Sequence, residues 1–288
     1  MYKIRIRAMR KQISFILVMV AIFLGAEISS GQENLSAEDL QQYLIKLESP
    51  DFPARAEAIN FLCSYYKERE IPGFVFKKLI NLLFDEAEKE KLFYSYANKP
   101  GMITDKVPRD LLYINSAEYA QYRLSLIRLA ARSKEEKVLS LLVERWPDYL
   151  ALANYGDLAV ELIIDNINSG GKNRFSLVRV LRSFIKGGET PYKAEGKSRE
   201  KIKATLKEMA LRDEDSYVRI CAIEALGESG DSDVIPLLEK IAATDNYKVE
   251  LEARSEDPSQ PARKVIKYPA REAARQELEK LKKGTHCP

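Results

Sequence analysis

The chain has 288 residues with 46 basic and 43 acidic side chains, and its single histidine, His286, is third from the end. That position excludes Ser-His-Asp and Cys-His nucleophilic sites from the folded part of the chain. The sequence has no glycine-rich phosphate loop after a strand, and Asp231 and Asp233 do not begin a calcium loop. We therefore expect no catalytic residue, no metal and no cofactor, although a carboxylate-based enzyme stays open.

The first 31 residues have the pattern of a secretory signal peptide. Basic residues precede the apolar run ISFILVMVAIFLG, which has 13 residues, whereas a membrane-spanning helix needs roughly 20. Ser29 and Gly31 fit the small-residue positions before a cut at Gln32. We therefore expect a signal peptide over 1–31, no stable membrane span after cleavage, and a periplasmic or secreted location; an uncleaved anchor is the alternative.

Removal of residues 1–31 changes the charge of the chain. It takes away five of the 46 basic residues and one of the 43 acidic residues, so the mature chain is nearly neutral. Nucleic acid binding needs a cluster of basic side chains, and we see none, so we expect no nucleic acid partner.

Cys63 and Cys221 lie in apolar helical patterns and are expected to be buried thiols, whereas Cys287 belongs to the tail. We expect a monomer.

The first helical pattern, Leu47–Leu62 (LESPDFPARAEAINFL), recurs later in the chain. It aligns without a gap with Leu211–Leu226 (LRDEDSYVRICAIEAL), and six of sixteen positions are identical. The shared Ala, Ile and later Leu fall on one helical face, which is the stripe that a helix buries. The shared charged residues are the structural anchors of the repeat: Asp51 with Asp215, and Arg55 with Arg219.

The arginine of this pattern marks further repeats. Arg123, Arg174 and Arg271 are also followed by apolar residues at helical spacing, and successive anchors lie 68, 51, 45 and 52 residues apart. Helical repeats of about 40–47 residues, some lengthened by insertions, fit these distances. We expect the Asp215 carboxylate to cap the first turn of its helix and to face Arg219 one turn later.

The stretch DEDSYVRICAIEALGESGDSDVIPLLEKI resembles the HEAT-like repeats of many bacterial proteins, and Leu47–Phe84 resembles it less closely. The resemblance implies an all-α fold, a HEAT-like α-α superhelix (solenoid) over 32–288. It also implies Asp–Arg bonds between neighbouring repeats and a concave binding surface. Tyr119, Gly170 and Lys267 stand where the Asp would be, which argues against an unbroken Asp–Arg ladder.

Insertions and an aromatic, acidic region lie between the better-matched repeats. Residues 87–116 are expected to extend one helix and then cross over, and residues 186–198 to form a mobile linker. Tyrosines gather near the only tryptophan, and such a cluster is either a protein-binding surface or ordinary packing. The candidate binding residues of this region are Trp146, Tyr149, Tyr155 and Glu161.

Residues 247–268 indicate a small β-hairpin near the C-terminus. YKVELEAR alternates apolar and charged residues, SEDPSQPA has turn-forming residues, and RKVIKY follows, although a disordered loop is the alternative. Tyr247 and Leu251 are candidate binding residues, because insertions in repeat proteins often lie on the binding face. We expect a non-enzymatic scaffold for an unknown protein or peptide. The alternative is a carboxylate-based enzyme or a carbohydrate-binding module that uses the middle region.

Overall fold

The computed structural model describes residues 37–97, 107–188, 191–253 and 263–284. The expected signal peptide and the tail with His286 and Cys287 lie outside these residues. The chain divides into two compact units, residues 1–45 and 46–288. In the first unit the described residues belong to helix α2 (Ala37–Lys46), which ends at the first residue of the second unit.

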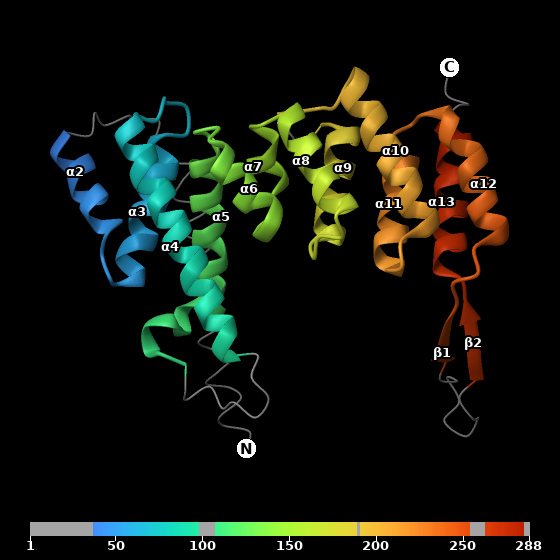
Figure 1. Ribbon diagram of the computed structural model, residues 1–288, viewed down its shortest axis with the longest axis horizontal. Helices are drawn as coiled ribbons and strands as arrows, with labels where there is room; N and C mark the ends of the chain where they lie inside the picture. The colour runs from blue at the N-terminus through green and yellow to red at the C-terminus, as the bar shows by residue number, and fades with distance from the viewer. Residues whose placement is uncertain (1–36, 98–106, 189–190, 254–262, 285–288) are drawn as a thin grey trace. The chain divides into compact units, whose positions relative to one another are not determined.

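The second unit consists almost entirely of helices (Figure 1). Its elements in chain order are α3 (Phe52–Tyr65), α4 (Gly73–Ala97), η2 (Arg109–Asn115), α5 (Ala117–Ala131), α6 (Glu136–Arg145), α7 (Tyr149–Ala153), α8 (Asp157–Asn168), α9 (Arg174–Lys186), α10 (Gly196–Arg212), α11 (Ser216–Glu228), η3 (Ser232–Val234), α12 (Ile235–Thr244), β1 (Val249–Ala253), β2 (Arg263–Lys267) and α13 (Pro269–Gly284). Across the described residues, we find no helix with the length and apolar character needed to cross a membrane.

The helices of the second unit pack in two layers. Helices α3, α5, α7, α9, α11 and α13, which we call the A helices, each contact the next one in this order. The B helices are α4, α6, α8, α10 and α12, and among them α6 contacts α8 and α8 contacts α10. The layers contact each other, for example where α10 packs on α11 and α12 on α13 (Figure 1). Stacked helix pairs of this kind confirm the expected HEAT-like all-α solenoid fold.

The apolar stripe that defines the repeat forms the core. The six residues that the alignment pairs on this stripe are all 0% exposed: Ala58, Ile59 and Leu62 in α3, and Ala222, Ile223 and Leu226 in α11. Residues that are equivalent in sequence are therefore equivalent in burial. Truncation of one such leucine to alanine typically costs about 2–5 kcal/mol, so these positions account for much of the stability of each repeat.

Acidic residues begin several of the A helices. The Asp215 carboxylate accepts the backbone N–H of Tyr217 at 2.8 Å, as expected for the cap of α11. Asp148 caps α7 in the same way, through the N–H of Ala151 at 2.8 Å. Such a bond is worth about 1 kcal/mol because it satisfies an N–H that the helix leaves unpaired. Asp51 also precedes its helix, but its side chain makes no capping bond.

The two middle insertions differ in structure. Helix α4 continues to Ala97, as expected for the start of 87–116, and η2 then contacts both α4 and α5. In the segment 186–198, Ala194 is buried and its backbone N–H donates to the carbonyl oxygen of Phe184 at 2.9 Å. This part of the segment is therefore held against α9, and the expectation of a mobile linker is wrong at Ala194.

The hairpin near the C-terminus is confirmed. Strands β1 and β2 pair antiparallel, with Val249 opposite Lys267 and Leu251 opposite Val265. Strand β1 (VELEA) alternates apolar with charged residues, which is the pattern that predicted it, whereas β2 (RKVIK) has two charged residues followed by two apolar ones. The residues that join the strands, 254–262, lie outside the described part of the chain.

The two described cysteines are free thiols. Cys63 is half-buried in α3 and Cys221 is buried in α11, which agrees with their apolar sequence surroundings. Burial raises the pKa of both thiols because it disfavours the charged thiolate. Both groups are therefore less reactive than an exposed cysteine at neutral pH.

Candidate interaction surface

The aromatic cluster expected near Trp146 lies in the core. Trp146 and Tyr155 are each 7% exposed, and Tyr149 is half-buried. The indole N–H of Trp146 donates to the Glu90 carboxylate at 2.5 Å, and the Tyr155 hydroxyl donates to the carbonyl oxygen of Glu135 at 3.2 Å. These side chains are held by the packing of the A and B helices, so for Trp146 and Tyr155 the structure supports ordinary packing over an accessible binding surface.

Two buried glutamates of α4 organise this core. Glu86 is 0% exposed and forms an ion pair with Arg55 at 3.1 Å. Tyr113 donates its hydroxyl to Glu86 at 2.9 Å, and Arg123 forms an ion pair with Glu90. Burial and the neighbouring Glu86 carboxylate raise the pKa of Tyr113, because both disfavour a second negative charge. These residues form a network of ion pairs and hydrogen bonds. Removal of one partner by mutation would leave a buried charge without its counterpart.

The carboxylates of the middle region face the solvent. Glu161 is exposed and pairs with Lys201 of α10. Hydrogen bonds from Ser198 and from the Tyr192 hydroxyl, which lies 2.5 Å from the Asp157 carboxylate, lower the pKa of Asp157. Within the described part of the chain, no three His, Cys, Asp or Glu side chains gather in an arrangement that could hold a metal ion. This arrangement gives no support to the carboxylate-based enzyme.

An arginine–aspartate ladder joins the starts of three A helices. Arg174 at the start of α9 forms an ion pair with the Asp213 carboxylate at 3.3 Å. Arg219 of α11 donates to the carbonyl oxygen of Asp213 at 3.0 Å and lies 3.8 Å from the Asp245 carboxylate. Arg271 of α13 donates to the carbonyl oxygen of Asp245 at 2.5 Å. The ladder therefore fixes the N-terminal ends of α9, α11 and α13 relative to one another.

The ladder uses other aspartates than the repeat alignment indicates. Arg55 donates to the carbonyl oxygen of Ser49, six residues earlier, as Arg219 does to Asp213. The two arginines are thus equivalent in structure, as the alignment predicted. Asp51 and Asp215 do not pair with them, so the expectation that Asp215 faces Arg219 is wrong. Asp215 instead caps α11. Arg219 bonds to Asp213 at the end of α10, and Arg55 bonds to Ser49 in the turn after α2.

Three aromatic side chains are exposed beside the ladder. Phe175 is the second residue of α9 and 41% exposed, and Tyr217 is the second residue of α11 and 71% exposed. Tyr247 is 36% exposed, and the Arg219 guanidinium lies 4.9 Å from its ring centroid. We call Phe175, Tyr217 and Tyr247 the aromatic edge. Large exposed aromatic residues next to a rigid polar frame are typical of a surface that binds another protein.

A hollow of about 370 Å³ lies at the Arg174–Asp213 ion pair, and Phe175 is the next residue of α9 after Arg174. It is lined by Arg174 and Arg212, by the acidic residues Glu208, Asp213 and Glu214, and by apolar Ile167 and Met209. The mixture of both charges with apolar surface fits a peptide better than a small apolar ligand. The hollow and the aromatic edge together form the candidate interaction surface.

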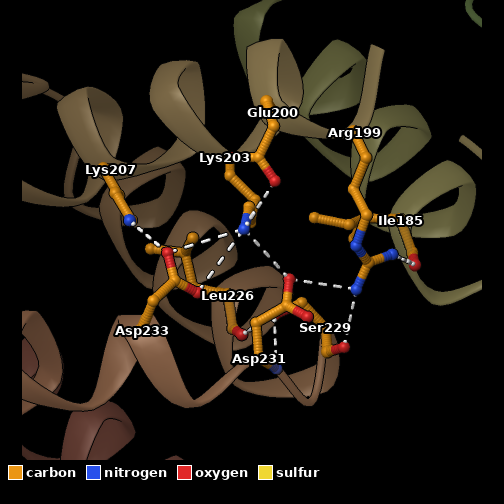
Figure 2. Close-up of polar contacts among 9 residues, drawn as sticks. All are labelled: Ile185, Arg199, Glu200, Lys203, Lys207, Leu226, Ser229, Asp231 and Asp233. Carbon is orange, nitrogen blue, oxygen red and sulfur yellow. Dashed lines mark hydrogen bonds and ion pairs between the residues drawn. The ribbon is translucent and has the colours of Figure 1, made fainter. Parts of the chain in front are cut away.

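The opposite end of α11 carries a second polar network, which Figure 2 shows. Arg199 donates to the carbonyl oxygens of Ile185 and Ser229, each at 2.9 Å, and forms an ion pair with Asp231 at 3.1 Å. Lys207 pairs with Asp233 at 2.8 Å, which lowers the pKa of that carboxyl. The network ties α10 to the turn after α11. Asp231 and Asp233 therefore serve as partners for basic residues of α10.

Sequence reasoning named Tyr247 but missed Phe175 and Tyr217. Leu251 lies in β1, where its backbone pairs with Val265. A signal for Phe175 and Tyr217 was present, because each aromatic residue stands immediately before or outside the apolar stripe of its helix. Tyr217 precedes Val218, the first buried residue of α11, and Phe175 precedes the stripe that begins at Leu177. An aromatic residue off the buried stripe predicts an exposed ring.

The comparisons with known proteins agree with this architecture over one part of the chain. The family model for HEAT repeats matches residues 193–256, which include α10, α11, α12 and β1. No curated protein and no solved structure shows significant similarity to the chain. The matched region holds Tyr217, Tyr247 and the centre of the arginine–aspartate ladder. These findings support a HEAT-like repeat protein, and HEAT repeats in general serve as protein-interaction scaffolds.

Proposed function

We propose that this protein is a non-enzymatic scaffold that binds another protein or a peptide at the aromatic edge. The observation that carries the proposal is the exposure of Phe175, Tyr217 and Tyr247 beside the ladder. Such aromatic side chains supply a large contact area for little lost conformational entropy, and they are frequent hot spots of protein interfaces. The HEAT-repeat match over 193–256, which includes Tyr217 and Tyr247, supports a protein as the partner.

The arginine–aspartate ladder beside the aromatic edge favours tight binding. Arg219 contacts both Asp213 and Asp245, so the chain segments that carry Tyr217 and Tyr247 are fixed before a partner arrives. The Arg219 guanidinium also lies over the Tyr247 ring, which restricts that ring. A surface that is ordered in advance loses less entropy on binding, so more of the contact energy appears as affinity.

We further propose that the protein acts as a monomer outside the cytoplasm, in the cell envelope or the secreted space. The basic residues and the 13-residue apolar run at the N-terminus support this setting. A protein recovered outside the cytoplasm with its N-terminus near Gln32 would fit the proposal. A main form that stays in the cytoplasm with Met1 intact would contradict it.

Enrichment of partner proteins on the tagged protein, measured quantitatively, tests the binding function. Phe175→Ser with Tyr217→Ser removes two rings of the aromatic edge without touching the ladder, and Phe74→Ser removes another exposed ring at the start of α4. Proteins retained by the tagged wild-type protein are expected to be lost with the double variant and kept with Phe74→Ser. Equal retention by all three proteins would overturn the assignment of the aromatic edge.

A further inference from the structure

We propose that the hairpin β1–β2 binds an extended, acidic segment of a partner protein, which adds as a third strand along the free edge of β2. The inference rests on the proposed function, because it names the chemistry of a segment that the scaffold would hold. Addition of a strand to an open sheet edge is a common mode of peptide recognition, in which backbone hydrogen bonds provide the affinity.

The hairpin is inserted into a repeat whose helices are already joined by a bond between Arg271 and Asp245. Arg219 donates to the carbonyl oxygen of Asp213, which lies six residues earlier. Arg271 makes the equivalent bond to Asp245, which lies 26 residues earlier. The extra residues between Asp245 and Arg271 contain the hairpin, and the helix-to-helix bond forms across its base. The helical repeat therefore does not need the hairpin for its own contacts.

The hairpin is open on its faces and at its edges. The sheet has two strands in the described part of the chain, so each strand has one edge without a neighbouring strand. Val265 is 37% exposed and Ile266 is 50% exposed, although successive residues of a strand point to opposite faces. The helices therefore cover neither face at these positions (Figure 1). An isolated two-stranded sheet is only marginally stable, so a third strand would stabilise it.

The charges of the two strands are segregated. Strand β1 reads VELEA with two acidic residues, and strand β2 reads RKVIK with three basic residues. In β1, Glu250 already has a basic neighbour, because Lys248 lies 3.8 Å from it. In β2, exposed Lys267 stands next to the exposed apolar Ile266. The edge of β2 therefore suits a strand in which acidic and apolar residues alternate.

The same segregation disfavours pairing with a second copy of the chain. Two-fold symmetric pairing places a strand against the same strand of the other copy. That would bring basic β2 against basic β2, or acidic β1 against acidic β1, and like charges directly opposite each other destabilise a sheet. An acidic segment of another protein avoids this repulsion. The charge pattern thus disfavours a symmetric dimer. Head-to-tail pairing of β2 with β1 of another copy would match the charges, but it would continue from copy to copy without closing. A segment of another protein is therefore the occupant that we propose.

Peptide titration tests the proposal. The probe is a short synthetic peptide that alternates Glu and Val, and the control peptide alternates Lys and Val. Binding to the protein is followed by fluorescence anisotropy, and amide hydrogen exchange locates the bound peptide. We expect the Glu/Val peptide to bind and to protect the backbone amides of 265–267, and the Lys/Val peptide to bind more weakly. Lys267→Glu should weaken the Glu/Val complex about fivefold, while Lys77→Glu on α4 should leave it unchanged.

The outcomes separate the hairpin from the aromatic edge. Equal binding of both peptides, or equal effects of Lys267→Glu and Lys77→Glu, would overturn the strand-addition proposal. Protection confined to α11 would also overturn it. Phe175→Ser with Tyr217→Ser should not change binding of the Glu/Val peptide. A failure of that double variant to lose natural partners would therefore count against the aromatic edge alone, and not against the hairpin.

Discussion

Arg219 links two neighbouring repeats, because it donates to the carbonyl oxygen of Asp213 and lies 3.8 Å from the Asp245 carboxylate. We expect Arg219→Ala to lower the free energy of unfolding by about 1–3 kcal/mol, since a buried carbonyl and a half-buried carboxylate lose their partner. Arg271→Ala, in the last repeat of the ladder, should cost less. Urea unfolding of both variants measures the difference, and equal losses would contradict the linking role of Arg219.

Glu228 gives the protein a defined dependence on pH. Arg182 donates to its two carboxylate oxygens at 2.8 and 2.7 Å, which holds the pKa of Glu228 below its ordinary value of 4.5. A carboxyl group with a lowered folded-state pKa stabilises the protein above its unfolded pKa, and the contribution disappears as the pH falls through the folded pKa. Between about pH 5 and pH 3, Glu228→Gln should therefore lose less stability than the wild type. Parallel melting-temperature curves for the two proteins over this range would argue against it.

The arginine anchors could be predicted from the sequence, but their partners could not. Alignment identified Arg55 and Arg219, whereas the partner Glu86 lies in the charged stretch FDEAEKEK, which reads as a solvated helix surface. Its spacing held a signal, because Glu86 and Glu90 continue the buried stripe of Leu79 and Leu83 at helical intervals. Composition alone does not predict buried glutamates, because a buried carboxylate depends on a basic partner from a distant part of the chain.

At the scale of elements, helices α11 and α13 require a glycine where they meet. A Cβ atom at Gly227 would lie 2.5 Å from the Cβ and 2.6 Å from the Cγ of Glu277, which is 3% exposed. We expect Gly227→Ala to destabilise the protein by about 1–3 kcal/mol, because the helices must separate to admit the methyl group. Gly73→Ala at the start of α4 is the matched control, since no atom lies within 4 Å of its added Cβ. Equal melting temperatures of the two variants would contradict this close packing.

We expect the hairpin to be needed for peptide binding but not for folding. Replacement of Glu250–Val265 by a short Gly/Ser linker is expected to keep the helical circular dichroism signal and most of the stability, because Arg271 bonds to Asp245 across the base. The same variant should bind the Glu/Val peptide much more weakly. A variant that no longer folds would make the hairpin part of the structural core. Alternation of apolar and charged residues in the first arm, with the turn-forming residues after it, was enough to predict this element, whereas its open faces became visible only in the structure.

At the scale of the whole molecule, the repeat pattern predicted the helical stack but not its binding surface. The arginine anchors and the buried stripe mark five of the six A helices within residues 46–288, but not α7, which has no anchor. Phe175 and Tyr217 lie off the buried stripe, which indicates exposed rings, but the bonds of Arg219 to Asp213 and Asp245 beside them are absent from a local pattern. The aromatic region around Trp146 had the stronger composition signal, yet tertiary packing places it in the core. The number of aromatic residues in a stretch thus does not predict whether their rings lie in the core or are exposed to a partner.

Site-specific photo-crosslinking most directly tests the central claim that the aromatic edge binds a protein. A photoreactive phenylalanine analogue replaces Tyr217 in one sample and Phe74 in the other, and both proteins are irradiated in their own cells. The two positions are matched, since each is an exposed ring in the first turn of a helix. We expect a discrete crosslinked protein from position 217 that is absent from position 74. The same crosslinks from both positions, or none from position 217, would contradict the claim.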